Sequence, residues 1–267
     1  MERKNINQVL QDARVNPAIE YMRLHDMFYK FSYEFCDEVH LYDACKDSFW
    51  DMPFRGTCIS IADYNDYYGF NFQNEPHYLD LNEFLLFCEY SYNLLLYARL
   101  YFGGYHVEEP KKMYFDQLTR AIDNVGYMFV RSSNGMMILV QKDIAAISVA
   151  EITDTNTSSM VMEYNHHILK GNLTKKKTIL KFLADDLEPK RKVLASINKS
   201  LSETLFQMFH RFIRHNNQDN PPISTMTDDE IEGCYDDIYQ LWLLAKLEID
   251  NLERKKRAET ILQKVNQ

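Results

Sequence analysis

A cationic cluster lies at the end of one amphipathic segment of the chain. Arg211, Arg214 and His215 are followed directly by Asn216 and Asn217. On an α-helix, residues four apart are neighbours, so the heads of Arg211 and His215 can meet. Guanidinium groups bind phosphate oxygens, and an imidazole with a pKa of about 6.5 can transfer protons near neutral pH. The cluster could hold or cleave a phosphodiester, or it could only complement the negative end of a helix dipole.

The segment that carries this cluster has the apolar pattern of a helix. Apolar residues recur there at the helical period. They are Leu201, Leu205, Met208, Phe209 and Phe212. The pair Asn216-Asn217, followed by Pro221-Pro222, is typical of a helix end. We therefore expect one α-helix over 197–217, with the cationic cluster in its last turns.

A closing helix is predicted to start after Thr227, and its first turns could meet the cluster. Thr227 and Glu230 have the spacing of a capping box. Tyr235, Asp236 and Tyr239 follow, and they could orient the imidazole of His215. Alternatively, Arg214 and His215 could pair with Asp236 or Asp237 and join two helices structurally. The sequence leaves both interpretations open.

Charge is distributed unevenly along the chain. The net charge is −9, from 30 basic and 39 acidic residues. Residues 170–214 contain 11 basic and 4 acidic residues, a net charge of +7, so the remainder carries −16. This block includes Lys175, Lys176 and Lys177, which are further candidates for binding an anion. Such a balance argues against a general nucleic-acid-binding protein, but the block could attract a polyanion or an acidic protein surface.

The sequence contains few signals for a metal or a cofactor. The five cysteines form no CxxC pair, and HExxH, GxxxxGK, GxGxxG and GxSxG are absent. His166 and His167 are adjacent, and on a helix their side chains would point about 100° apart, which disfavours shared ligation. We expect no cofactor and no metal site.

The sequence also predicts a cytoplasmic protein without a membrane segment. The N-terminus lacks the apolar core of a signal peptide, and no apolar run is long enough to cross a bilayer. The scattered cysteines fit a reducing compartment.

Periodicity and turn residues predict a mainly α fold, a helical bundle with an inserted β-hairpin. One or two helices are expected over 18–45, and further helices over 80–101, over 111–123, within 153–173, and from 175 to 197 with a break at Pro189. Another is expected to start at 228. Residues 51–80 are predicted to form a loop or short strands, and 145–152 a strand or a helix. Around Asn134-Gly135, residues 127–140 are typical of a type I′ hairpin. A boundary after residue 108 would separate an aromatic-rich, mostly helical region, 1–108, from a hairpin and helical bundle, 109–267.

The C-terminal half resembles bacterial proteins of the abortive-infection type. The residues that carry the resemblance are Lys170-Gly171-Asn172, Leu183-Ala184, Leu187-Glu188, Arg214-His215-Asn216-Asn217, Tyr235-Asp236-Asp237 and Tyr239, with the hairpin at 127–140. The resemblance implies a HEPN-like helical bundle. That superfamily includes metal-independent ribonucleases of toxin–antitoxin and anti-phage systems, which usually form homodimers. Their active sites carry an Arg and a His with about four to six residues between them. Only three residues lie between Arg211 and His215 here, which departs from that pattern.

Two functions therefore remain as expectations from the sequence. The first is a HEPN-like module in phage defence or toxin–antitoxin biology that binds RNA or a protein partner. The second is a metal-independent endoribonuclease in which His215 transfers protons and Arg211 and Arg214 bind the phosphate.

Overall fold

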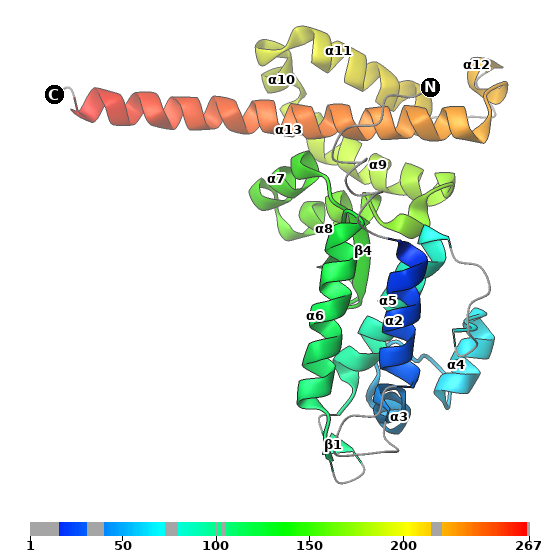
Figure 1. Cartoon of the computed structure of the whole chain (residues 1–267). Helices are drawn as coiled ribbons and strands as arrows, with labels where there is room; N and C mark the ends of the chain where they lie inside the picture. The colour runs from blue at the N-terminus through cyan, green and yellow to red at the C-terminus, as the bar shows by residue number, and fades with distance from the viewer. Residues whose placement is uncertain are drawn as a thin grey trace. The chain divides into compact units, whose positions relative to one another are not determined.

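The computed structural model describes residues 16–30, 40–72, 80–99, 101–102, 105–214 and 221–265. The described residues are mainly helical and include a short antiparallel hairpin, which confirms the predicted fold class. The chain divides into two compact units, Met1–Gln141 and Lys142–Gln267 (Figure 1). We call them the first unit and the second unit.

The division between the units falls after Gln141, whereas the sequence predicts a boundary after residue 108. Residues 109–141 belong to the first unit because Tyr114, Leu118 and Leu139 are fully buried in its hydrophobic core. Residues 108–110 are the first turn of a helix that begins at Glu108. The hairpin is therefore part of the N-terminal unit.

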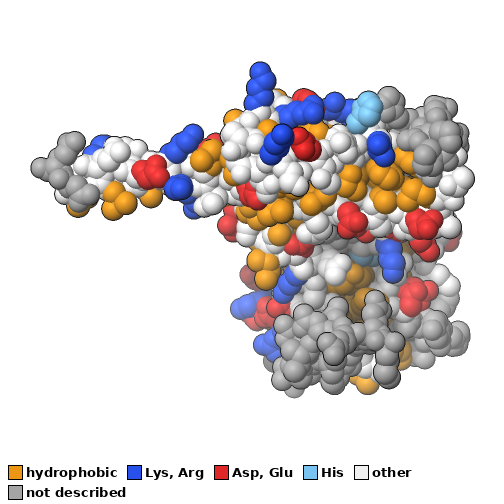
Figure 2. Space-filling view, turned by 90° about the horizontal axis from the view of Figure 1, so that it is seen from above, with side chains coloured by type: hydrophobic (Ala, Val, Ile, Leu, Met, Phe, Trp, Pro, Cys, Tyr) orange, Lys and Arg blue, Asp and Glu red, His pale blue; other side chains and the backbone are white. Residues whose placement is uncertain are grey.

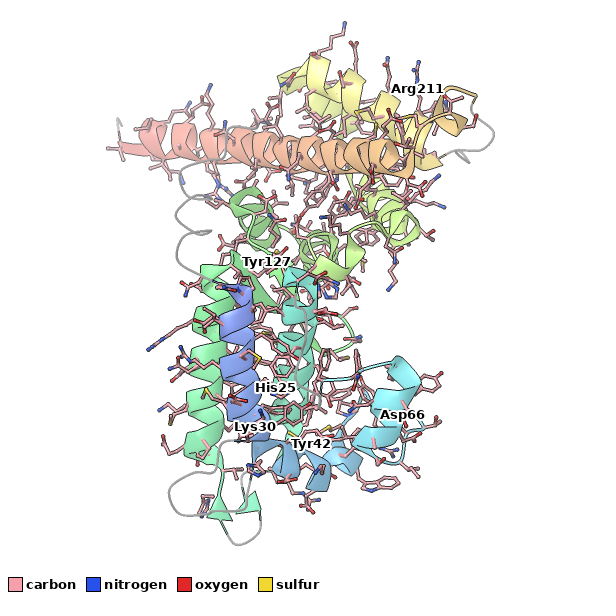
Figure 3. The ribbon with its side chains drawn as sticks, turned by 45° about the vertical axis from the view of Figure 1, so that its right-hand side comes forward. His25, Lys30, Tyr42, Asp66, Tyr127 and Arg211 are labelled. Atoms are coloured by element: carbon pink, nitrogen blue, oxygen red, sulfur yellow. The ribbon has the colours of Figure 1, made fainter. Side chains whose placement is uncertain are left out.

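The first unit is built of helices and two small two-stranded sheets. Its elements are α2 (Pro17–Tyr29), α3 (Leu41–Asp47), η1 (Phe49–Asp51), α4 (Ile61–Tyr68), α5 (Leu81–Tyr97), β1 (Tyr101–Phe102), β2 (Tyr105–His106), α6 (Glu108–Asn124), β3 (Tyr127–Arg131) and β4 (Met137–Gln141). Helices α2, α5 and α6 pack against one another, and Leu24, Phe28 and Phe87 fill the core between them. His25 on α2 is also fully buried, and its Nε2 lies 2.8 Å from the carbonyl oxygen of Phe72 (Figure 3).

Side-chain caps begin α2 and α5 close to the starts predicted at residues 18 and 80. The Asn16 side chain accepts a hydrogen bond from the Ala18 amide, and Asp80 accepts one from the Glu83 amide at 2.8 Å. The sequence predicts that the helix capped by Asp80 ends at residue 101, before Gly103-Gly104, whereas α5 ends at Tyr97 because Ala98 is already extended with ψ of 136°. Gly103 and Gly104 lie outside the described residues.

Helix α4 corrects the prediction of a loop or short strands over 51–80. Ser60 accepts a hydrogen bond from the Asp63 amide at 3.1 Å and begins the helix. Gly69, with φ of 72°, ends it in the left-handed conformation. The aromatic residues of this region obscured the helical period because they lie on several faces, as exposed Tyr67 and buried Tyr64 show.

The predicted hairpin forms, but its turn differs from the predicted type. Strands β3 and β4 are antiparallel, with Phe129 opposite Leu139. Only Gly135, with φ of 85°, has a positive φ in the described turn, so Asn134 does not adopt the geometry that a type I′ turn requires. The Gly135 amide donates to the Ser132 carbonyl at 3.0 Å, and the Ser132 amide donates to Met136 at 2.8 Å. These bonds define a three-residue loop with a glycine bulge.

The outer edge of β4 is satisfied by side chains of α5. The Asn93 side chain accepts a hydrogen bond from the Met137 amide at 2.9 Å and donates one to the Met137 carbonyl at 2.7 Å. The Glu89 carboxylate accepts a hydrogen bond from the Leu139 amide. These side chains bond backbone groups that a third strand would otherwise pair. Fewer unpaired groups then remain on the edge of β4, where another chain could add a strand and cause aggregation.

The second unit is helical throughout its described residues. Its elements are α7 (Ile144–Ile152), α8 (Thr155–Tyr164), η2 (His167–Leu169), α9 (Leu173–Leu187), η3 (Glu188–Lys190), α10 (Arg191–Ile197), α11 (Lys199–Met208), η4 (Phe209–Arg214), α12 (Pro221–Ser224) and α13 (Asp228–Val265). The segment 145–152, left open by the sequence, is helix α7, which Asp143 caps. The predicted break at Pro189 is confirmed, since η3 separates α9 from α10 there.

Helix α13 is the central element of the second unit. It packs against α7 and α9 and against α10 and α11, as Figure 1 shows. Trp242 is fully buried, and its Nε1 donates to the Leu183 carbonyl at 2.8 Å. The predicted capping box is present, because the Thr227 amide donates to the Glu230 carboxylate at 2.8 Å and the Glu230 amide donates to the Thr227 hydroxyl at 3.3 Å.

Candidate functional site

The cationic cluster lies only partly within the described residues. Arg211 and Arg214 belong to η4, whereas His215, Asn216 and Asn217 lie outside the described part of the chain. The geometry of a site built on His215 is therefore still a prediction. The described part of the cluster allows two arginines to be placed.

The segment before position 215 is not the single α-helix that was predicted over 197–217. Helix α11 ends at Met208, and residues 209–214 form a π-helical turn. Phe209 and Ile213 are buried there, which keeps the inner face apolar. A π-turn hydrogen-bonds residues five apart, so side chains four apart no longer stack as in an α-helix. Such short π-helical segments are often found at functional sites.

Arg214 forms its ion pairs with the end of α9 and with η3. Its guanidinium hydrogen-bonds the Glu188 carboxylate and lies 3.9 Å from that of Asp185. The alternative in which Arg214 pairs with Asp236 or Asp237 is therefore wrong for Arg214. Residues 209–214 pack on α9 as well as on α13, and the acids of α9 and η3 lie within its reach.

Arg211 is the more available of the two arginines. It is exposed, and it makes no ion pair with any described residue. Figure 3 shows its side chain on the outer side of η4, away from the core of the second unit. An exposed, unpaired guanidinium can bind a phosphate group without first losing an internal partner.

Lys176, predicted with Lys175 and Lys177 to bind an anion, is buried and paired within the second unit. Its Nζ lies 2.7 Å from the Asp236 carboxylate and 2.8 Å from that of Glu232. Only 8% of the Lys176 side chain is exposed. Lys175 is exposed, and burial lowers the pKa of the half-buried Lys177. Lys176 therefore joins α9 to α13, and only its neighbours could contact a ligand.

The other candidates on α13 belong to the same polar cluster. The Tyr164 hydroxyl donates to Asp236 at 2.9 Å, and its ring stacks on that of Tyr239 at 4.1 Å between centroids. The Tyr239 hydroxyl donates to the Val161 carbonyl at 2.8 Å, and Tyr235 is buried. Burial and nearby Asp236 raise the pKa of Tyr164, and burial raises that of Tyr239. Both phenols stay neutral, so they are poor proton-transfer groups.

Glu232 completes the cluster around Lys176. Burial alone would raise the pKa of its carboxyl group, but hydrogen bonds from Lys176 and the Gly171 amide hold the pKa below its usual value. The Gly171 amide donates at 2.8 Å. Lys176, Glu232, Asp236 and Tyr164 thus form a structural junction among α8, α9 and α13. Asp236 and Tyr239, predicted as binding residues, contribute to this junction.

A basic surface extends from η3 to η4. Residues 190–214 contain six Lys or Arg side chains and one acid, Glu203, a net charge of +5. All six cations are exposed: Lys190, Arg191, Lys192, Lys199, Arg211 and Arg214. In Figure 2, Lys and Arg side chains gather along one edge of this face. We call these six residues the basic face.

Some members of the basic face have partners within the unit. The Arg191 guanidinium lies 4.6 Å from the centre of the Phe206 ring, and Lys199 lies 3.7 Å from Glu203. Lys190 and Lys192, together with Arg211, have no ion pair among the described residues. Reasoning from the sequence missed Lys190 and Lys192 as individual site residues, although the charge of the block indicated them.

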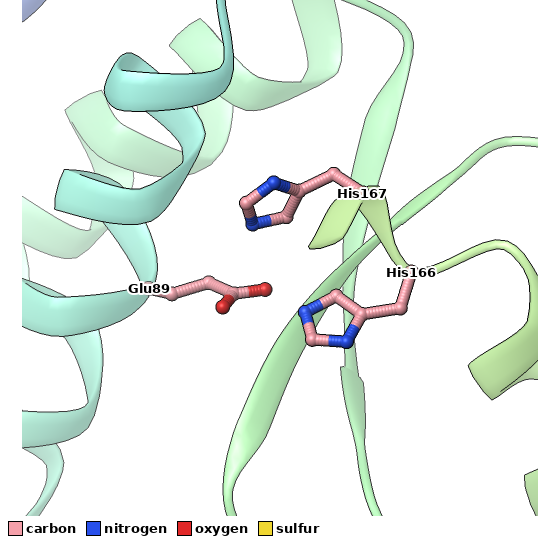
Figure 4. A group of neighbouring side chains, drawn as sticks. All are labelled: Glu89, His166 and His167. Carbon is pink, nitrogen blue, oxygen red and sulfur yellow. The ribbon is translucent and has the colours of Figure 1, made fainter. Parts of the chain in front are cut away.

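The sequence predicts that His166 and His167 lie together near the end of one helix, but α8 ends before them, at Tyr164. His166 precedes η2 and His167 is its first residue; both are buried, with ring centroids 5.1 Å apart and ring planes nearly perpendicular (Figure 4). A ring nitrogen of one lies within 4.8 Å of a ring nitrogen of the other. Each of the two histidines is 8% exposed.

Comparison of the chain with protein-family models, with curated proteins and with solved structures found no match. Among the described helices, none has both the length and the apolar character needed to cross a bilayer.

Proposed function

We propose that this protein is a helical RNA-binding module that holds the phosphate backbone on the basic face of its second unit. The observation that carries the proposal is the segregation of charge. A chain with a net charge of −9 exposes six cations, and one acid, within residues 190–214. Such a patch attracts a polyanion locally, while the acidic remainder repels it.

The unpaired cations support backbone binding more than base recognition. Lys190, Lys192 and Arg211 project from η3, α10 and η4, and none is committed to an internal ion pair among the described residues. Contacts of Lys and Arg with phosphate supply affinity with little sequence information. The resemblance to HEPN-like proteins of the abortive-infection type favours RNA over other polyanions and a role in bacterial phage defence or toxin–antitoxin biology.

Binding of a fluorescent single-stranded RNA, followed by anisotropy over a range of salt concentrations, tests the proposal. The double variant Lys192→Glu/Arg211→Glu should bind about tenfold more weakly or worse, and the slope of log K against log salt should fall by about 0.7 for each lost phosphate contact. The matched control is Lys112→Glu/Arg120→Glu, which reverses two exposed charges on α6. Equal weakening by both double variants would show that only net charge matters and would contradict the proposal.

A second function, metal-independent RNA cleavage, is favoured by one observation. Arg211 is exposed and unpaired, and His215 follows four residues later. In this reaction Arg211 would bind the phosphate and His215 would transfer the proton, while Arg214 would first have to leave Glu188. Incubation of labelled RNA with the protein in EDTA tests this function. Cleavage by the natural protein that is lost in His215→Ala would support this function. RNA that is bound but stays intact would rule out cleavage and support only the binding function.

A further inference from the structure

The last turns of α13 extend beyond the core of the second unit. Ile249 is the last buried residue of the helix, and residues 253–265 are all exposed. Ile261 and Leu262 are each 60% exposed and Val265 is 76% exposed. A helical extension of this length gains little stability in water unless an apolar face is covered. The three apolar side chains therefore indicate a missing partner.

An exposed stripe runs along nearly the whole of α13 and reaches this extension. Its members alternate at spacings of four and three residues. They are Gly233, Asp237, Gln240, Leu244, Leu247, Asn251, Arg254, Ala258, Ile261 and Val265. Leu247 is half-buried and the others are exposed. Leu244 is 45% exposed although it lies within the packed part of the helix. This is the repeat of a coiled-coil seam, which covers itself with another helix.

The two ends of α13 carry opposite charges. Its start exposes five acids, Asp228, Asp229, Glu230, Asp236 and Asp237, whereas its extension exposes five cations, Arg254, Lys255, Lys256, Arg257 and Lys264. The extension contains two acids, Glu253 and Glu259. A parallel helix pair would place the basic extensions side by side. An antiparallel pair would place each basic extension on the acidic start of the other helix.

We propose that the partner is a second copy of this chain, paired antiparallel along α13. A two-fold axis between positions 245 and 246 would bring Leu244 opposite Leu247 of the second copy, and Gln240 opposite Asn251. The same register puts Asp237 opposite Arg254 and places Gly233, which has open space around its Cα, opposite Ala258. These four layers combine an apolar pair, an amide pair, opposite charges and two small residues, so the stripe from Gly233 to Ala258 is compatible with one register. Ile261 would lie beyond these layers, opposite Glu230 of the second copy.

Arg254 is free to form the intermolecular pair. Within the chain it pairs with Asp250, one turn earlier on the same helix. Its side chain is 62% exposed, and such surface pairs contribute little to stability. Exchange of Asp250 for Asp237 of a second copy would therefore cost little, while it would also fix the orientation of the two helices.

Analytical ultracentrifugation of the full chain over a concentration series tests the proposal. The natural protein should form a dimer, and both Asp237→Arg and Arg254→Asp should weaken dimerisation by about tenfold or more, because each places like charges in one layer. The double variant Asp237→Arg/Arg254→Asp should recover the dimer, since it restores opposite charges. Lys192→Glu, on the basic face, is the control and should leave the dimer unchanged.

Three outcomes would overturn the inference. The natural chain could sediment as a monomer at every concentration, the single variants could dimerise as the natural chain does, or the double variant could stay monomeric. Circular dichroism checks that each variant is folded, and a second disruptive variant, Leu244→Glu/Leu247→Glu, tests the apolar centre of the seam independently of the charges. None of these residues belongs to the basic face. A failure of the dimerisation test can therefore be distinguished from a failure of the RNA-binding test.

Discussion

Lys176 on α9 and Asp236 on α13 form an ion pair of 2.7 Å in the second unit. The two residues are 60 positions apart in the sequence. The lysine is buried, and the aspartate is 52% exposed. The same ammonium group lies 2.8 Å from the Glu232 carboxylate, so one cation pairs with two acids near the start of α13. The junction is a property of helix packing, and it makes specific predictions about stability.

Replacement of Lys176 should destabilise the second unit. Lys176→Met leaves Glu232 and Asp236 without their common cation, and we expect a loss of about 2 kcal/mol. This is less than the cost of about 3–5 kcal/mol for breaking a fully buried pair, because Asp236 can still be hydrated. The measurement is urea unfolding followed by circular dichroism. Lys175→Met, one residue earlier and exposed, is the control and should change the free energy of unfolding by less than about 0.5 kcal/mol.

Acid should weaken the same junction through Glu232. The pKa of this carboxyl group is lower in the folded protein than its usual value. The folded state therefore binds its proton less readily than the unfolded state, and the extra stability is present above the unfolded pKa. It is lost as pH falls through the folded pKa. The free energy of unfolding should decline more steeply below about pH 4.5 in the natural protein than in Glu232→Gln. Parallel curves for the two proteins would contradict this.

Arg214→Ala should have a small effect on stability. The Arg214 and Glu188 side chains are both 38% exposed, and ion pairs with such access to water contribute at most about 1 kcal/mol. The melting temperature should therefore fall less than in Lys176→Met. A larger fall in Arg214→Ala than in Lys176→Met would contradict this ranking.

Asn93→Ala should weaken the hairpin of the first unit. The substitution removes both hydrogen bonds to the Met137 backbone and leaves its amide and carbonyl unpaired on the edge of β4. We expect a cost of about 2–3 kcal/mol and faster hydrogen exchange at the Met137 amide. Asn124→Ala, an exposed amide at the end of α6, is the matched control. Hydrogen exchange at Met137 that is unchanged by Asn93→Ala would refute this role.

Several elements could be predicted from neighbouring residues alone. Asn16, Asp80 and Thr227 begin their helices because each side chain bonds a backbone amide two or three residues away. Pro189 interrupts α9 and α10 because it lacks an amide proton. The hairpin over 127–140 forms around Asn134-Gly135, although the turn takes the bulged form. In each case the cause and the effect lie within one or two turns of chain.

Contacts between residues far apart in the sequence depend on how the helices pack in three dimensions. The sequence indicated that a cation would neutralise Asp236, but it suggested Arg214, whereas packing places Lys176 there, 60 residues away. It also indicated a basic block without showing that Lys176 is buried while Lys190, Lys192 and Arg211 remain exposed. Local hydrogen bonds depend on the identity of adjacent residues. Ion pairs and exposure depend on which helix faces meet, and that is set only when the whole core packs.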